Sequence, residues 1–563
     1  MQQKYLITLA FFITVTIITA IFIAVFLNLN LNNASNDDGN NTLVENPPIA
    51  PFMDEILPNP DYDGIIDLNW SDVNGATTYY LYRYTSLIVS TNGLTPIYVG
   101  VQSNHTDSGL PCGIFHYVAV AGNSSGNSSI SNCENVTIEP PHNSWTWISG
   151  SNSVNQLGVY GEKGVTDGNN IPGGRDRSTS SVAPDGSFWL FGGDIDSIHY
   201  LNDLWKFDGE NWMWVSGSSS YYQTGVYNQK GVANASNCPG ARADSISWIT
   251  PDGSFWLFGG VGNCVNASGL LNDLWKFDGA NWTWMSGSDY INQKGYYGEK
   301  GVADAINVPG ARSSSISWID QNGSLWLFGG YGYNNDTSGR LGDLWRYNIT
   351  DGQWTWISGS YSLNTLGIYG QKGIADSSNV PGARERSISW VDGNSSLWLF
   401  GGNGFNNLSY GRLNDLWRYN ITDGQWTWVS GSYSTYSVGE YGQKGVANEN
   451  NMPGSRNESI SWIDQEGYLW LFGGNGFNNV TQGVLNDLWK FDGANWTWVS
   501  GNYSVDQLGE YNQKGVANIN NIPGSRQQSI SWVAQDGTFW LFGGLGYTNS
   551  TSGYLNDLWS YKI

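Results

Sequence analysis

The sequence is poor in the residues that active sites, metal centres and nucleic-acid interfaces use most. Its 563 residues include 4 His and 4 Cys, and 25 Lys and Arg stand against 48 Asp and Glu, for a net charge of −23. Phosphate binding requires clustered basic side chains, so this balance excludes a nucleic-acid partner. No glycine loop of the phosphate-binding type is present, and no pair of carboxylates stands apart from repeated positions. We therefore expect neither enzyme activity nor a cofactor.

Charge is also absent from Tyr5 to Leu27, a run of 23 mostly apolar residues. As a helix rising about 1.5 Å per residue, such a run spans a hydrocarbon core of about 30 Å. No small-residue cleavage pattern follows it, which favours an uncleaved signal anchor over a secretory signal peptide. Because Lys4 precedes the run, the sequence predicts a cytoplasmic segment 1–4, a transmembrane helix 5–27 and C-terminal domains outside the cell.

Two regions follow before the composition changes at Pro140-Pro141. Residues 28–48 are polar and end in Pro47-Pro48, which is typical of a stalk. Residues 49–140 contain short strand signals that predict a separate β-sandwich. The region resembles a fibronectin type III domain: Trp70 matches the core Trp of the second strand, Tyr80-Leu81-Tyr82-Arg83 the third strand, and Tyr117-Val118-Ala119-Val120 the sixth. That resemblance implies a spacer or interaction module.

The remaining chain repeats one pattern six times. The anchor Trp-Leu-Phe-Gly-Gly recurs at intervals of 67 to 72 residues, and a Leu-Asn-Asp-Leu-Trp element or a near copy follows each time. The anchors begin at Trp189, Trp256, Trp326, Trp398, Trp470 and Trp540, and the second elements at Leu201, Leu271, Leu341, Leu413, Leu485 and Leu555. Repeats of this length are the signature of solenoids and propellers.

Each repeat contains two predicted β-hairpins with Asp-Gly or Asn-Gly type turns, hence four short antiparallel strands. Four strands per repeat predict the blade of a β-propeller. The paired glycines and the following Trp resemble the kelch motif, and the resemblance covers Trp145 to Ile563. It implies an all-β fold in which residues 141–563 form six blades. Kelch-type propellers include the central domain of galactose oxidase, but only His199 falls within the repeats, so the resemblance does not extend to that enzyme's copper site.

The two ends of the repeat region predict a closed ring. Trp145-Thr146-Trp147 reads as a fourth strand with no blade before it, and Leu555 to Ile563 reads as a third strand with no fourth strand after it. The N-terminal strand most simply completes the last blade. Closure removes the unpaired sheet edges that promote aggregation.

The connections divide the two faces of the predicted propeller. First-to-second and third-to-fourth connections are tight glycine turns, whereas second-to-third and inter-blade connections are long, so a binding site is expected on the long-loop face. Every inter-blade connection ends in Pro-Gly-x-Arg. A residue present in all copies has a role that all copies share, so we expect these arginines to be structural. A cation ring that binds an acidic glycan or carboxylate is the alternative. The arginines are Arg175, Arg242, Arg312, Arg384, Arg456 and Arg526.

A single site should break the symmetry of the repeats. The first repeat carries Asp194, Asp196 and His199 where others carry Gly and Asn. Two carboxylates so spaced can bind Ca²⁺, although no complete loop motif is present and a plain polar loop is the alternative. Further candidates on the same face are Tyr333, Arg340, Phe405, Arg412, Phe477 and Tyr547. In an exported chain the four cysteines favour Cys112–Cys133 and Cys238–Cys264 disulfides, with pairing across the two regions left open.

These observations favour a membrane-anchored surface protein that binds an extracellular glycan or a protein through its long-loop face. A carbohydrate-active oxidase or glycan hydrolase is the second hypothesis, although a sialidase-type Ser-x-Asp-x-Gly-x-Thr-Trp box is absent. A structural surface-layer component is the third. Sequons such as Asn69, Asn266 and Asn420 make a glycoprotein possible if the host glycosylates its surface proteins.

Overall fold

The computed structural model describes residues 46–62, 64–111, 113–139 and 143–563. All regular elements in these ranges are β-strands. In the same ranges there is no helix that is long and apolar enough to cross a membrane. The predicted fold class is therefore corrected: the described chain is all-β, and it supports neither the predicted transmembrane helix nor the predicted single-pass membrane localisation. The predicted helix falls on residues 5–27, which lie outside the described residues.

The described chain forms two compact units. The first comprises residues 46–58, 66–107 and 114–136, and the second comprises 59–65, 108–113 and 137 onward. The boundary predicted at residue 140 falls in the gap 140–142, outside the described residues.

Two small sheets make up the N-terminal region. Trp70, the predicted core residue, is buried there and its ring contacts Tyr79 and Tyr98. One sheet pairs β1 (Ile65–Asn69) with β4 (Asn104–Ser108). The other contains β3 (Tyr98–Gly100), β2 (Thr78–Tyr84), β5 (Gly113–Asn123), β6 (Gly126–Asn127) and β7 (Glu134–Ile138).

The rest of the chain forms six antiparallel blades. The blades below are numbered in chain order, and their four main strands are given from the innermost outward. Blade 1 contains β10 (Thr179–Val182), β11 (Phe188–Asp194), β12 (Tyr200–Phe207) and β13 (Trp212–Ser216). Blade 2 contains β15 (Ile246–Ile249), β16 (Phe255–Asn263), β17 (Ser268–Phe277) and β18 (Trp282–Ser286). Blade 3 contains β20 (Ile316–Ile319), β21 (Leu325–Phe328) continued by β22 (Tyr331–Tyr333), β23 (Ser338–Arg340) continued by β24 (Gly342–Asn348), and β25 (Gln353–Ser360).

The second half of the ring repeats this order. Blade 4 contains β28 (Ile388–Val391), β29 (Leu397–Phe405), β30 (Tyr410–Asn420) and β31 (Gln425–Ser430). Blade 5 contains β33 (Ile460–Ile463), β34 (Leu469–Phe477), β35 (Gln482–Phe491) and β36 (Trp496–Ser500). Blade 6 contains β38 (Ile530–Val533), β39 (Phe539–Tyr547), β40 (Ser552–Lys562) and β8 (Ser144–Ser149).

Two-residue strands extend the blades at both edges. Before the inner strands lie β14 (Arg242–Ala243), β19 (Arg312–Ser313), β27 (Arg384–Glu385), β32 (Arg456–Asn457) and β37 (Arg526–Gln527), each paired with the far end of the second strand. On the outer edge, β9 (Thr166–Asp167) pairs with β13 and β26 (Ala375–Asp376) pairs with β31. The inter-blade connection thus covers part of an edge that would otherwise be open.

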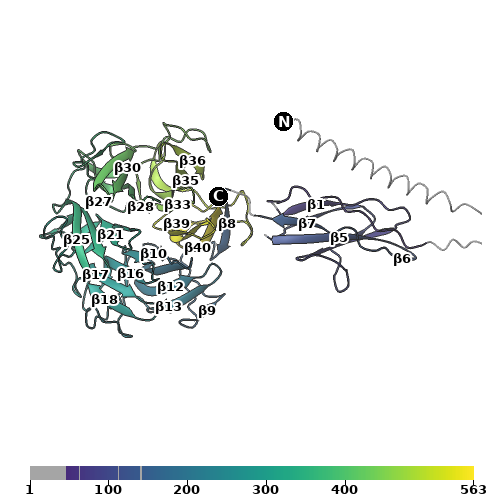
Figure 1. Ribbon diagram of the computed structural model, residues 1–563, viewed down its shortest axis with the longest axis horizontal. Helices are drawn as coiled ribbons and strands as arrows, with labels where there is room; N and C mark the ends of the chain where they lie inside the picture. Colours follow the sequence, from purple (N-terminus) through teal and green to yellow (C-terminus); the bar gives the residue numbers. More distant parts are fainter. Residues whose placement is uncertain (1–45, 63, 112, 140–142) are drawn as a thin grey trace, which may run out of the picture. The chain divides into compact units, whose positions relative to one another are not determined.

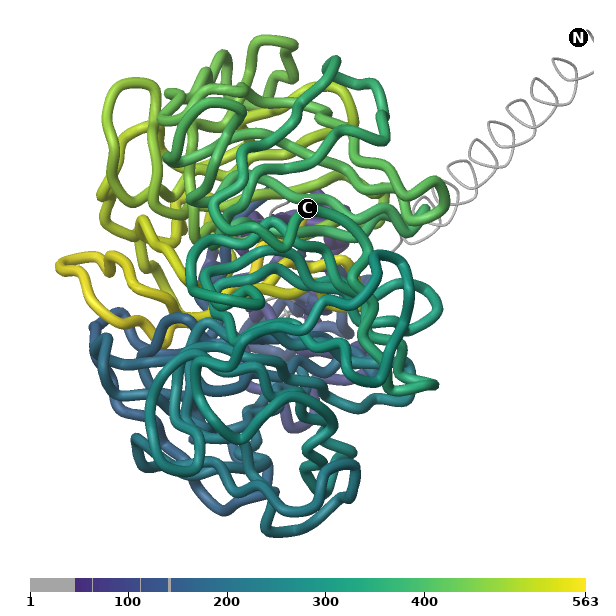
Figure 2. Tube along the Cα trace, turned by 90° about the vertical axis from the view of Figure 1, so that its left-hand side faces the viewer, coloured from purple at the N-terminus to yellow at the C-terminus, as the bar shows by residue number. Residues whose placement is uncertain are grey.

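The six blades close into a ring. Each inner strand contacts the inner strands of both neighbours, in the order β10, β15, β20, β28, β33, β38 and back to β10. In Figure 1 the yellow strands β39 and β40 lie beside the blue strand β8, and Figure 2 follows the chain through the blades in colour order. β8 pairs with β40 from Ser144↔Lys562 to Ser149↔Leu558, which confirms that the N-terminal strand completes the last blade.

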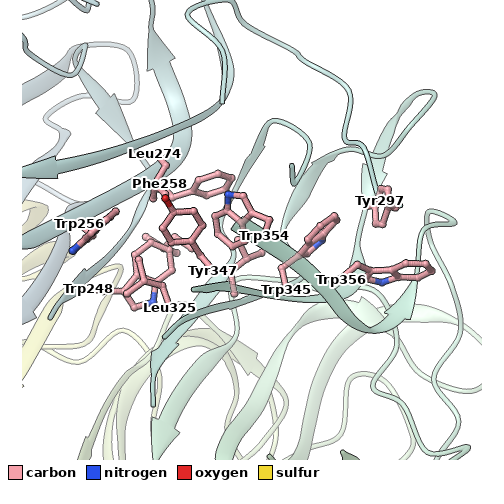
Figure 3. Close-up of a cluster of buried hydrophobic side chains, with 12 residues drawn as sticks. Trp248, Trp256, Phe258, Leu274, Tyr297, Leu325, Trp345, Tyr347, Trp354 and Trp356 are labelled. Atoms are coloured by element: carbon pink, nitrogen blue, oxygen red, sulfur yellow. The ribbon is translucent and has the colours of Figure 1, made fainter. Parts of the chain in front are cut away.

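The hydrophobic core lies between neighbouring blades. Between blades 2 and 3, for example, Trp248 and Phe258 pack with Leu325, Trp345 and other apolar side chains (Figure 3). The indole N–H groups of Trp248, Trp318, Trp390 and Trp462 each donate to a main-chain carbonyl of the next blade. Each large apolar side chain buried in this way contributes roughly 1.5–3 kcal/mol, so the blades stabilise one another as a ring.

The repeated Gly-Gly forms a bulge that turns the second strand. In blade 4 the register shifts between Phe400 and Gly402, and Gly401 and Gly402 have φ of 62° and 94°. A Cβ on Gly402 would meet the Ser387 hydroxyl and the Glu385 carbonyl. Glycine is required here because other residues seldom adopt these angles and none would fit.

Candidate binding site on the propeller axis

Each repeated arginine is buried against the aspartate of the Asn-Asp-Leu-Trp element in its own blade. In blade 4, Nη1 and Nη2 of Arg384 lie 2.7 and 2.8 Å from Oδ1 and Oδ2 of Asp415. Tyr369 OH and Trp417 Nε1 also donate to Oδ2, at 2.6 and 2.7 Å. The other five ion pairs are Arg175–Asp203, Arg242–Asp273, Arg312–Asp343, Arg456–Asp487 and Arg526–Asp557.

Each inter-blade connection also carries a lysine, and this lysine contacts a Trp ring and a main-chain carbonyl of its own blade. Lys372 Nζ lies 4.5 Å from the centre of the Trp428 ring and donates to the Gly431 carbonyl. The same pair of contacts is made by Lys163, Lys230, Lys300, Lys444 and Lys514. Twelve basic side chains are therefore held within the scaffold, which leaves few cations on the long-loop face for a ligand.

The six residues that follow the repeated arginines by two positions are joined by main-chain hydrogen bonds into a closed ring around the axis. The N–H of each of these residues donates to the carbonyl of the equivalent residue in the preceding blade, with N···O distances of 2.9 to 3.3 Å. All six residues have φ between 52° and 60°, a conformation that residues other than glycine adopt rarely. They are Arg177, Asp244, Ser314, Arg386, Glu458 and Gln528.

The side chains of this ring and the serines that follow them line a cavity of about 130 Å³ on the axis. Arg386 Nη1 lies 2.5 Å from Glu458 Oε1, and Gln528 Nε2 donates to the same oxygen at 2.7 Å. Arg177 Nη1 lies 3.3 Å from Asp194 Oδ2. The two arginines come from blades 1 and 4, and the two carboxylates of the ring come from blades 2 and 5.

Burial changes the electrostatics of this axial pocket. Burial raises the pKa of Asp244 above its ordinary value despite the nearby Arg177 and Arg386. The pKa of Glu458 is raised for the same reason, although Arg386 opposes the shift. Among the described residues, Nε of both arginines and Oε1 of Gln528 are buried without a hydrogen-bond partner. The fold therefore leaves part of the hydrogen-bonding capacity of these three ring residues unused.

A second pair of carboxyl groups lies beside the pocket, below the surface. Asp176 and Asp194 are 2% and 0% exposed and face each other across an isolated β-bridge. Burial and the Asp194 carboxylate raise the pKa of Asp176 to about 9, so it is protonated at neutral pH. Asp194, a candidate from the sequence, is therefore held inside the fold by Asp176 and Arg177.

The other candidates from the sequence are spread over several blades. Asp196 pairs with His199 at 2.5 Å on the surface of blade 1, and in the described chain no group of three His, Cys, Asp or Glu side chains is placed to bind a metal. Arg340 pairs with Glu385 at 2.8 Å, and Arg412 donates to Asn457. Tyr333, Phe405, Phe477 and Tyr547 lie in the second-to-third hairpins of blades 3 to 6.

Sequence reasoning missed the axial ring itself. Its signal was visible: the residue two positions after the invariant Arg differs in charge or size between most copies. No strand or turn pattern in the sequence predicts a left-handed residue at that position.

The cysteine predictions are corrected in one case and left open in the other. Cys238 and Cys264 are both free, so the predicted bridge between them is wrong. Cys238 lies in a main-chain bridge with Val226 and accepts from Asn202 Nδ2, while Cys264 is buried at its own hairpin. The two thiols thus lie on different connections, Cys238 before blade 2 and Cys264 within it. Cys133 is free, and Cys112 lies outside the described residues.

Comparison with known proteins supports the repeat type. Residues 162–360 match the family model of the KLHDC2/KLHL20/DRC7 Kelch-repeats domain. No curated protein matches the chain. Among the solved structures that match are "Structure of FN3tt mut" and "Crystal Structure of FN3tt", each 22% identical with a TM-score of 0.13. They cover 16% of this chain and 93% and 91% of their own. At that TM-score the likeness carries no assignment, and the fibronectin type III resemblance stays a prediction. The family match over residues 162–360 and the four-stranded blades support repeats of the kelch type.

Proposed function

We propose that the propeller binds a protein partner through its long-loop face, without turnover, and that the axial pocket receives a small polar or charged group of that partner. Kelch domains generally mediate protein–protein interaction, which supports the class of partner. The single observation that carries the proposal is a contrast within each blade. The Arg–Asp pair is the same in all six blades, whereas the axial residue next to it differs between most of them.

The distribution of exposed apolar side chains supports the same face. Within the propeller, most exposed large hydrophobic residues lie on inter-blade or second-to-third connections. The exceptions are Val182, Ile349 and the strand residues Tyr331 and Tyr410. Leu157, Leu408 and Val480 are 77–78% exposed on such connections. Exposed apolar side chains around a polar centre are typical of protein-interaction surfaces.

The enzyme hypothesis gains no specific support from the site. Asp176, whose pKa burial raises to about 9, and its neighbour Asp194 are closed to a substrate because both side chains are buried. A glycan is the other ligand class predicted from the sequence, and it forms one arm of the test below.

The test uses a double variant whose new residues already occupy the equivalent position in other blades. Arg386→Ser with Glu458→Gln places in blades 4 and 5 the residues that blades 3 and 6 carry at the same position and φ. Glu466→Gln, on an exposed first-to-second turn, is the control. A random-peptide phage library and a glycan array are screened with the full chain. We expect selected peptides to bind the control normally and the axial variant at least tenfold more weakly, with an unchanged Tm. Equal binding to both variants, or selective binding of glycans alone, would overturn the proposal.

A further inference from the structure

Blade 1 lacks a piece of chain that the other blades have. Seven residues (194–200) separate its Gly-Gly from the following Leu, whereas ten (403–412) do so in blade 4. In blades 2 to 6 the longer hairpin lies over the Pro-Gly that precedes the blade. A main-chain carbonyl oxygen of a hairpin residue occupies the position that a Cβ atom on this glycine would take. These residues are Asn263, Tyr333, Phe405, Phe477 and Tyr547, over Gly240, Gly310, Gly382, Gly454 and Gly524.

The next hairpin residue ties two connections together in blades 3 to 5. In blade 4 the Asn406 carbonyl accepts from the Gly367 N–H at 2.9 Å, and Asn406 Nδ2 donates to the Tyr433 carbonyl at 2.8 Å. The equivalent bonds join Asn334 to Gly295 and Tyr361, and Asn478 to Gly439 and Tyr503. An aromatic–asparagine dipeptide thus fills this position in three blades: Tyr333-Asn334, Phe405-Asn406 and Phe477-Asn478.

In blade 1 both main-chain partners of that asparagine are vacant. Gly158 occupies the place of Gly367, and Ser219 occupies the place of Tyr433. Within the described chain the Gly158 N–H has no acceptor and the Ser219 carbonyl has no donor. Gly158 is partly exposed, whereas the equivalent glycine is buried in each of the other five blades.

A cavity of about 370 Å³ occupies the space that the missing hairpin leaves. Gly158, Ser219 and Gly173 line it, together with apolar surface from Leu157 and Tyr221. The cavity therefore offers one main-chain donor, one main-chain acceptor and an apolar wall, at positions that an aromatic–asparagine segment satisfies elsewhere in the same ring.

We propose that the blade 1 pocket binds an aromatic–asparagine turn of a protein partner, which takes the place that a hairpin of the chain itself occupies in blades 3 to 5. The inference rests on the proposed function for the class of partner, a protein, and adds a second contact on the long-loop face. The partner's asparagine accepts from the Gly158 N–H through its main-chain carbonyl and donates to the Ser219 carbonyl through its side-chain amide.

The probe is a cyclised peptide with the sequence of residues 404–411, Gly-Phe-Asn-Asn-Leu-Ser-Tyr-Gly. We expect it to bind the full chain at least tenfold more tightly than the same peptide with Asn406→Asp, because an aspartate cannot donate to Ser219. Leu157→Arg should weaken binding of the probe at least tenfold without unfolding the chain, because Leu157 is 77% exposed. The axial variant Arg386→Ser with Glu458→Gln should bind the probe normally, so a failure of this proposal is distinct from a failure of the axial one.

Hydrogen–deuterium exchange gives a readout that needs no variant. In the free protein, amides of the segment around Gly158 should exchange faster than those around Gly367 and Gly439, and the probe should slow only the first segment. Equal binding of the two peptides, unchanged binding to Leu157→Arg, or exchange at Gly158 that the probe leaves unchanged would overturn the proposal.

Discussion

Replacing Asp415 by asparagine tests how the repeated arginines act. In the native fold Asp415 is 0% exposed and Arg384 is 1% exposed at the side chain. The carboxylate receives two bonds from Arg384 and one each from Tyr369 and Trp417. Three of these four bonds end on Oδ2. In Asp415→Asn, an amide NH₂ at that place would face three donors, and the charge of Arg384 would lose its counter-ion.

The expected loss of stability in Asp415→Asn follows from the buried donors and the buried charge that the change leaves unpaired. Breaking a buried ion pair by removing one partner costs about 3–5 kcal/mol. Each buried donor that is left unsatisfied costs about 1–3 kcal/mol, although neighbouring terms overlap and do not add fully. We therefore expect Asp415→Asn to lower the free energy of unfolding by about 3–5 kcal/mol. The control is Asp423→Asn, the same change at an exposed turn of the same blade, which should stay within about 0.5 kcal/mol.

Urea unfolding followed by Trp fluorescence, with calorimetry of the propeller transition, measures both variants. Tyr369→Phe supplies the second arm of a double-mutant cycle, because its hydroxyl donates to Asp415 at 2.6 Å. Alone it should cost about 1 kcal/mol, and in the Asp415→Asn background it should cost nothing or restore stability. If Asp415→Asn is within 1 kcal/mol of the control, or if the two changes are additive, the buried network does not hold the blade together.

Three further changes test separate parts of the fold. Because burial and Asp194 raise the pKa of Asp176 to about 9, the folded chain holds a proton between about pH 4 and pH 9 that the unfolded chain releases. Stability from this group therefore falls as the pH rises through that window, by at most about 1.4 kcal/mol per unit. Asp176→Asn should remove this slope from a Tm-against-pH curve and raise Tm at pH 7; an unchanged slope would count against a protonated Asp176. Trp145→Ala on the closing strand β8, where Trp145 is 2% exposed, should cost about 3–5 kcal/mol in urea unfolding, and a cost below 1 kcal/mol would contradict ring closure by β8. Lys372→Met, which removes the contact with Trp428, should lower stability by only about 0.5–1 kcal/mol in the same assay, and a larger loss would show that the exposed cation is worth more than its geometry implies.

The repeat made the architecture accessible from sequence. Trp-Leu-Phe-Gly-Gly and Leu-Asn-Asp-Leu-Trp mark the two central strands of every blade, and the unpaired ends at Trp145 and Ile563 indicated how the ring closes. Local signals of this kind are reliable because strand alternation and Gly turns act within a few residues. The apolar run at residues 5–27 was a weaker basis for predicting a transmembrane helix, since hydropathy does not determine what an apolar segment packs against.

The site was less accessible because it depends on contacts between blades. The ring at Arg177, Asp244 and their equivalents joins residues about 70 positions apart in the sequence, and only the closed fold brings them onto one axis. The Cys238–Cys264 prediction was wrong for a related reason. Both cysteines lie on connections of the same face, but shared location does not bring two thiols into bonding geometry.

The most direct test of the central claim is a hydrogen–deuterium exchange footprint of a library-selected peptide on the full chain. The claim is that repeated residues build the ring while the axial residues that vary from blade to blade receive the partner. The account predicts protection around residues 177–178, 244–245, 386–387 and 458, which line the axial pocket. Protection confined to the tight turns, such as those around residues 252–253 and 466–467, would contradict it.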